Sequence, residues 1–108
     1  MAIDIKTRRS RIGNFTGGLS GPAIRPIALA MVHKVYQNVK IPIVGMGGIA
    51  TANDALEFII AGASAVAIGT ANFIDPATSL EVLEGIGDYL SKHRINDINE
   101  LIGSLNVG

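Results

Sequence analysis

The sequence predicts an α/β fold with parallel strands. Two short apolar segments, Ile41–Val44 and Ala65–Ile68, each run into a glycine-containing turn and then into a stretch with helical spacing. Strand, turn and helix repeated in this order are typical of βα units, whose strands are parallel. The turns are Gly45–Ile49 and Ile68–Asn72. With 108 residues the chain can form one domain at most, and we treat residues 1–108 as a single, partial domain.

The N-terminal part is expected to supply a strand end, a connector and a helix. Ile3–Ile5 is predicted to end a strand, which with the later strands would give two βαβ units. A basic connector follows, and Pro22 and Pro26 both suit the first turn of a helix. Apolar residues then recur at helical spacing, which predicts one buried helix face. They are Ile24, Ile27, Ala28, Met31, Val32 and Val35.

The middle of the chain reads as strand, helix, strand. Ile41–Val44 is predicted to be buried on both faces, as strands of parallel sheets are. Thr51 followed by Asp54 resembles a helix N-cap pair, in which Asp replaces the more usual Glu. Gly62 is a good end for that helix, and the next buried strand follows it.

The C-terminal part is predicted to be helical. Pro76 opens a helix, and a shorter terminal helix begins near Asp97. We expect four residues of the first helix to point inward: Leu80, Leu83, Ile86 and Leu90.

Composition excludes several classes of function. Lys+Arg and Asp+Glu both number 9, so no bulk attraction to nucleic acid or to a membrane surface is expected. There is no cysteine for a disulfide or a thiolate metal site, and no cluster of carboxylates or histidines suggests a metal. The opening residues do not resemble a signal peptide, so we expect a cytoplasmic protein. Hydrophobic residues make up 48%, which suggests a surface meant to be covered.

The two glycine turns predict a phosphate site. Glycine lets main-chain N–H groups approach a ligand closely, and two such turns on adjacent parallel strands can form a nest for an anion. The candidates are Gly47, Gly48, Gly69 and Thr70. Asn72 would either reach a ligand or cap the following turn. Three parallel strands cannot close a barrel, so the chain would be a small open α/β domain or the tail of a (β/α)8 barrel.

Three segments closely resemble the C-terminal part of the dihydroorotate dehydrogenases: Thr16–Ile24, Gly45–Ile49 and Gly69–Phe73. Met1–Arg8 resembles the catalytic subunit of the NAD-linked B type, and Ile95–Leu105 resembles the closing helix of the family. The resemblance therefore implies the C-terminal portion of a (β/α)8 TIM barrel, about its last two to three βα units.

The resemblance also implies an activity and a cofactor. The enzymes oxidise dihydroorotate to orotate with FMN, in pyrimidine synthesis. Carried over by residue, Gly21 would line the flavin, and Gly47 and Gly48 would bind FMN. Gly69 and Thr70 would donate hydrogen bonds to its phosphate.

The chain departs from the family in lacking a catalytic residue. The family's base is a cysteine on an earlier loop, and the groups that bind dihydroorotate and orotate also lie upstream of Met1. The expectation is a C-terminal fragment that is inactive alone. The B-type resemblance implies a partner subunit with FAD and an iron–sulfur cluster, and we expect a homo-oligomer.

Two alternatives remain open. The same glycine turns would serve a phosphate-binding barrel isomerase or synthase acting on a sugar phosphate. Exposed strand edges would suit a non-catalytic, self-associating half-barrel. A basic cluster is either a solvated hairpin or a contact with a subunit or anionic partner, and without aromatic residues it does not favour nucleic acid. It consists of Lys6, Arg8, Arg9 and Arg11.

Overall fold

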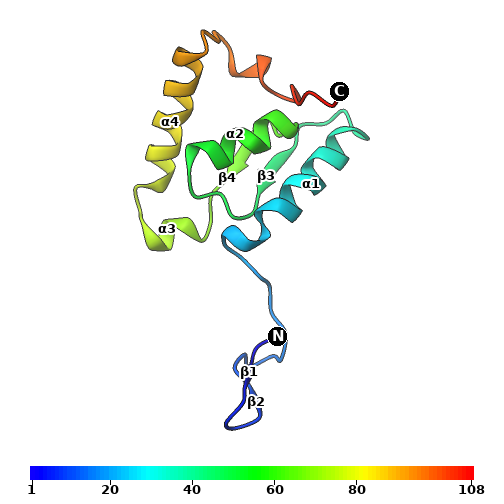
Figure 1. Cartoon of the computed structure of the whole chain (residues 1–108), viewed down its shortest axis with the longest axis vertical. Helices are drawn as coiled ribbons and strands as arrows, with labels where there is room; N and C mark the ends of the chain where they lie inside the picture. Colours follow the sequence, from blue (N-terminus) through cyan, green and yellow to red (C-terminus); the bar gives the residue numbers. More distant parts are fainter.

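A small hairpin projects from the body of the protein in the computed structural model, which describes residues 1–108 (Figure 1). Its strands, β1 (Ile3–Asp4) and β2 (Arg9–Ser10), are antiparallel. The prediction that Ile3–Ile5 belongs to the parallel sheet was therefore wrong. The Asp4 carboxylate accepts hydrogen bonds from the main-chain N–H groups of Lys6 and Thr7, which favours a tight reversal of the chain.

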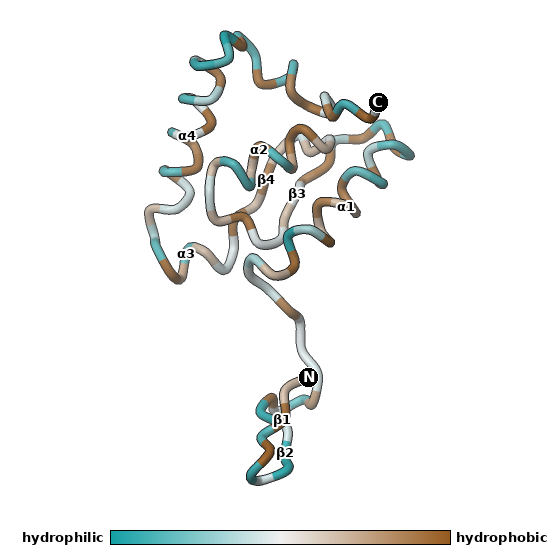
Figure 2. Tube along the Cα trace, in the orientation of Figure 1, coloured by the Kyte–Doolittle hydropathy of each residue, from teal (hydrophilic) through white to brown (hydrophobic).

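The basic cluster lies in and beside this hairpin, where its side chains are exposed. Figure 2 shows that hydrophilic residues predominate around the hairpin turn. The exposure is that of a solvated hairpin, and a contact of the cluster with a subunit or an anionic partner stays a prediction.

The predicted first helix is confirmed. A short 3-10 turn, η1 (Pro22–Ile24), leads directly into α1 (Arg25–Tyr36). Pro26 occupies the second position of α1, where its missing N–H costs no helical hydrogen bond.

Two parallel strands form the centre of the body. β3 (Val44–Met46) pairs with β4 (Ala65–Ala67), with Val44 opposite Ala65 and Met46 opposite Ala67. Helix α2 (Ala52–Ala61) connects them. The chain therefore contains one βαβ unit where two were predicted, because the first strand pairs within the hairpin.

Both ends of α2 follow the prediction. The Thr51 hydroxyl accepts the N–H of Asp54, and the Asp54 carboxylate accepts the N–H of Thr51, which completes a capping box. Gly62 ends the helix with a φ of 131°, a conformation that favours glycine.

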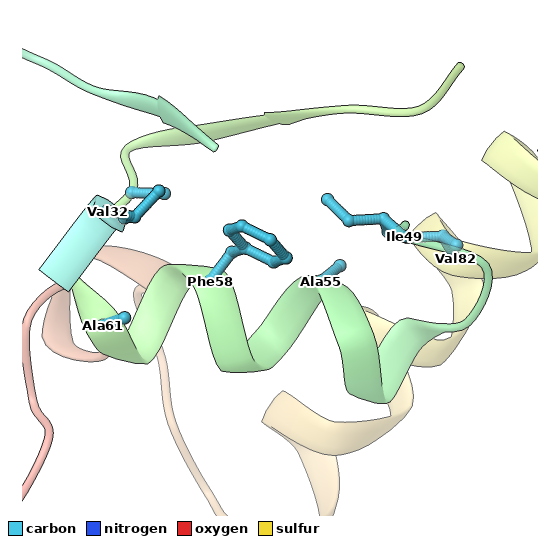
Figure 3. Close-up of a cluster of buried hydrophobic side chains, with 7 residues drawn as sticks. Val32, Ile49, Ala55, Phe58, Ala61 and Val82 are labelled. Carbon is cyan, nitrogen blue, oxygen red and sulfur yellow. The ribbon is translucent and has the colours of Figure 1, made fainter. Parts of the chain in front are cut away.

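The main core lies between α2 and one face of the sheet. Phe58 on α2 is fully buried, and a Cβ on Gly45 of β3 would lie 2.7 Å from its ring. Figure 3 shows Phe58 between α2 and the strands, with Val32 of α1 near one end and Ile49 and Val82 near the other. The absence of a side chain at Gly45 therefore lets α2 approach the sheet closely.

The opposite face of the sheet is open. Val44 and Met46 are 54% and 59% exposed, so the prediction of strands buried on both faces was wrong for this chain. Gly45, between them, is buried against α2. Alternate residues of a strand point to opposite faces, and here the helices cover only one of them.

The C-terminal part wraps around α2. After the short α3 (Ala71–Ile74), helix α4 (Thr78–Lys92) packs on α2, and a 3-10 turn, η2 (Ile98–Glu100), follows. The terminal helix predicted near Asp97 is thus reduced to a single turn.

The predicted inward face of α4 was only half right. Leu80 and Leu83 are about two-thirds exposed, whereas Ile86 and Leu90 are half-buried. Thr78 and Val82, one turn apart, are the residues that α4 buries. No helix combines the length and the apolar character needed to cross a bilayer.

Candidate phosphate-binding site

All the residues predicted to bind FMN line one cleft at the carboxyl ends of β3 and β4. Because Met46 and Ala67 are partners in the register, the turns after the two strands begin side by side. The segment before α1 forms a third wall. The cleft is lined by Ser20, Gly21, Ile24, Met46, Gly47, Gly48, Ala67, Ile68, Gly69 and Thr70. An adjoining hollow shares four of these residues and extends to Ile49, Ala50, Ala71 and Ile74.

The turn after β3 needs its glycines for its own shape. Gly47 and Gly48 have φ angles of 126° and 71°. A Cβ on Gly48 would lie 2.6 Å from the carbonyl oxygen of Gly21, and one on Gly47 would lie 2.8 Å from the Cβ of Ala28. These two residues therefore let the turn pack against the start of α1.

Gly69, in the turn after β4, is different. Its φ is not positive, and a Cβ there would meet nothing within 4 Å. Neither backbone conformation nor packing within the chain requires a glycine at this position. Gly69 is exposed and lines the cleft.

The cleft presents unpaired hydrogen-bond donors. The main-chain N–H groups of Gly47, Gly48, Gly69 and Thr70 donate no hydrogen bond within the chain. The Thr70 hydroxyl makes no capping bond to α3. Gly47 and Gly48 are half-buried, and Gly69 and Thr70 are exposed. Free N–H donors that two neighbouring turns place around one cleft are suited to an anion.

No charged side chain lines the cleft, so any attraction for an anion comes from main-chain dipoles and the Thr70 hydroxyl. Short helix α3 begins directly after Thr70. In (β/α)8 barrels a phosphate commonly binds where the loops after two neighbouring strands meet the start of such a short helix. The sequence reasoning did not anticipate α3, whose four residues are too few for a periodic signal.

Asn72 does not point to a ligand. Its side-chain amide donates to the carbonyl oxygen of Ile68 at 2.7 Å, and its oxygen lies 3.4 Å from the Ser79 hydroxyl. The amide thus closes the loop that precedes Asn72, and the predicted cap of the following turn is not formed.

The sequence reasoning missed an ion pair behind the cleft. Arg25, the first residue of α1, places Nη1 at 2.7 Å from Oδ1 of Asp54. The same carboxylate accepts the N–H groups of Ala50 and Thr51, both at 3.0 Å. Asp54 was recognised only as a helix cap, because no spacing in the sequence links it to an arginine 29 positions earlier.

Comparison with known proteins extends this picture. A family model described as dihydroorotate dehydrogenase matches residues 1–90. The catalytic subunit of dihydroorotate dehydrogenase B (NAD(+)) from Thermodesulfovibrio yellowstonii is 62% identical over 104 residues, and that from Alkaliphilus oremlandii is 57% identical over 105. These alignments cover 96% and 97% of this chain but 34% and 35% of the relatives. The chain thus spans about a third of the length of the curated relatives it matches.

Solved structures agree at the level of the fold. Crystal structures of DHODH from Eimeria tenella, one in complex with ferulenol and one ligand-free, are each 31% identical with a TM-score of 0.77. They match 94% and 92% of this chain, and the match covers 28% of each solved chain. On the strength of the family model and of these sequence and structural matches, the chain belongs to the dihydroorotate dehydrogenase family.

Proposed function

We propose that this chain forms the FMN-phosphate end of a B-type dihydroorotate dehydrogenase catalytic subunit, as the C-terminal part of its (β/α)8 barrel. The whole enzyme would oxidise dihydroorotate to orotate in pyrimidine synthesis, and bound FMN would supply the hydride acceptor. The observation that carries the proposal is the set of unpaired donors from two adjacent strand ends around one cleft.

The residues present fit the phosphate of FMN. Gly47 and Gly48 would hold the cofactor from the first turn, and Gly69 and Thr70 would donate main-chain and hydroxyl hydrogen bonds to the phosphate from the second. Gly21 would lie against the flavin. A phosphate monoester carries close to two negative charges at neutral pH and offers several acceptor oxygens, which match an array of neutral donors.

Chemistry other than cofactor binding would come from elsewhere in the enzyme. The chain has no cysteine to act as the base that the family resemblance implies, and no residue of this chain is assigned to catalysis or to dihydroorotate. We infer that an electron-transfer subunit with FAD and an iron–sulfur cluster completes the B-type enzyme, and that the enzyme is cytoplasmic.

Comparing FMN with riboflavin tests the proposal, because riboflavin lacks only the phosphate. Flavin fluorescence is titrated with the purified chain. A charge-assisted hydrogen bond contributes about 1.5–3 kcal/mol, so riboflavin should bind at least roughly 10-fold more weakly. Thr70→Val should weaken FMN binding, whereas Thr7→Val on the projecting hairpin should not. Equal binding of both flavins, or no binding of FMN, contradicts the proposal.

The alternative phosphate-binding barrel remains distinguishable by its ligand. Ribose 5-phosphate competes in the same titration. If it displaces FMN at concentrations far below those of FMN itself, the cleft serves a sugar-phosphate enzyme and the flavoenzyme assignment fails.

A self-associating half-barrel is the second candidate, and the open sheet face favours it. Val44 and Met46 expose apolar surface beside the unpaired edges of a two-stranded sheet. Homo-oligomers would then form by pairing these faces. Sedimentation equilibrium tests this: Met46→Glu should shift the chain toward monomer, whereas Phe73→Glu, at an exposed position on α3, should not. A wild-type chain that stays monomeric at high concentration contradicts it.

A further inference from the structure

The carboxylate of Asp54 joins three pieces of the chain behind the phosphate cleft. It accepts two main-chain N–H groups of the loop that follows β3, and it forms the 2.7 Å ion pair with Arg25 at the start of α1. The side chains of Asp54 and Arg25 are 10% and 30% exposed. A carboxylate this buried needs all of these partners to offset its loss of hydration.

These contacts lie next to the first phosphate-binding turn. Ile49, directly after Gly48, is 3% exposed and belongs to the main core, and Ala50 lines the hollow beside the cleft. A Cβ on Gly48 would lie 3.0 Å from the Cβ of Arg25. The ion pair therefore connects the loop that follows Gly48 to the start of α1, just after the segment that carries Gly21, and neither Arg25 nor Asp54 lines the cleft.

The second phosphate-binding turn is held independently. The Asn72 amide closes the loop after β4 onto Ile68, and no hydrogen bond or ion pair links that loop to Asp54. A defect in the ion pair should consequently disturb one wall of the cleft and leave the other in place.

We propose that the Arg25–Asp54 ion pair is a positioning device for FMN: it holds the Gly47–Gly48 turn against the start of α1 so that the N–H groups of this turn meet the phosphate end of the cofactor. This inference rests on the proposed function. Neither residue lines the cleft, so both act through the main chain that they hold.

Asp54→Asn separates the ion pair from the helix cap. The asparagine oxygen can still accept the N–H groups of Ala50 and Thr51, but the charge that attracts Arg25 is lost. Arg25→Met removes the same charge pair from the other side, and Arg25→Lys should restore part of it. Glu57→Gln is the matched control, because Glu57 is 49% exposed and lies 3.7 Å from Nε of the same arginine.

The first readout is flavin affinity of the full chain. Asp54→Asn and Arg25→Met should raise the Kd for FMN roughly 10-fold, since small displacements of binding groups have large effects. The Kd for riboflavin should stay within about twofold, because the phosphate end is the part affected. Arg25→Lys should fall between wild type and Arg25→Met, and Glu57→Gln should match wild type. General destabilisation would instead weaken both flavins in parallel, and that outcome overturns the inference.

The second readout is main-chain amide exchange by NMR, which needs no ligand. Asp54→Asn should speed exchange at Ala50 and Thr51 and leave the amide of Asn72, in the second turn, unchanged. Unchanged exchange at Ala50, or equal acceleration at all three amides, overturns the positioning role. If the wild-type chain bound no FMN, the proposed function would fail while the exchange measurement still decided whether the ion pair holds the turn.

Discussion

Replacing Gly48 by alanine is the sharpest perturbation of the Gly47–Gly48 turn. The φ of 71° lies in the left-handed region, which costs a residue with a Cβ about 1–2 kcal/mol. The new methyl would also lie 2.6 Å from the carbonyl oxygen of Gly21, a main-chain atom that cannot rotate away. Overpacking of this kind costs a further 1–3 kcal/mol or so. We therefore expect Gly48→Ala to lower the free energy of unfolding by about 2–5 kcal/mol.

Gly69→Ala is the matched control for this substitution. Its Cβ would meet nothing within 4 Å and its φ is not positive, so the free energy of unfolding should change by less than about 0.5 kcal/mol. Urea unfolding followed by far-UV circular dichroism measures both variants. Because Gly69 lines the cleft and is proposed to donate its N–H to the phosphate, FMN affinity should fall in this variant without a loss of stability. A Gly48→Ala variant as stable as wild type would refute the reasoning from backbone geometry.

Two further predictions concern regions away from the cleft. Gly87→Ala on the exposed side of α4 should raise the free energy of unfolding by about 0.5–1 kcal/mol, because alanine has the higher helix propensity. Gly85→Ala should lower it, because the new methyl would collide with α2. Urea unfolding measures both variants, and a Gly87→Ala variant less stable than wild type would contradict this. Hydrogen bonds from the N–H groups of Lys6 and Thr7 lower the pKa of Asp4, so the carboxylate stabilises the hairpin above about pH 4 and this stabilisation disappears as the pH falls through the lowered value. An NMR titration should find Asp4 with a pKa below that of an aspartate in an unfolded peptide, and equality would exclude the turn.

Much of the body could be predicted because its signals are local. The capping box at Thr51, the glycine at the end of α2 and the proline at the start of α1 each depend on residues within one helical turn. The grouping of Gly47 and Gly69 also followed from the sequence, since the carboxyl ends of adjacent parallel strands share one edge of the sheet.

The misses depend on contacts that the sequence does not encode locally. The hairpin is the exception, because the contacts of Asp4 with Lys6 and Thr7 are local. The strand-like residues of Ile3–Ile5 nevertheless suit a parallel strand as well as a hairpin strand. The buried face of α4 depends on how this helix packs against α2. Helical periodicity alone does not show whether the row of Leu80 and Leu83 or the row of Thr78 and Val82 faces α2. Arg25 reaches Asp54 only because α1 and α2 pack side by side.

The one-sided sheet places two different structural requirements on neighbouring residues. Gly45 is fixed by Phe58 behind it, whereas Val44 is exposed on the open face and lines no part of the cleft. Met46, the next residue on that face, does line the cleft. A substitution at Val44 can therefore match whatever surface covers the open face and leave the cleft undisturbed. A βαβ unit built in this way can therefore keep its ligand while its neighbours change.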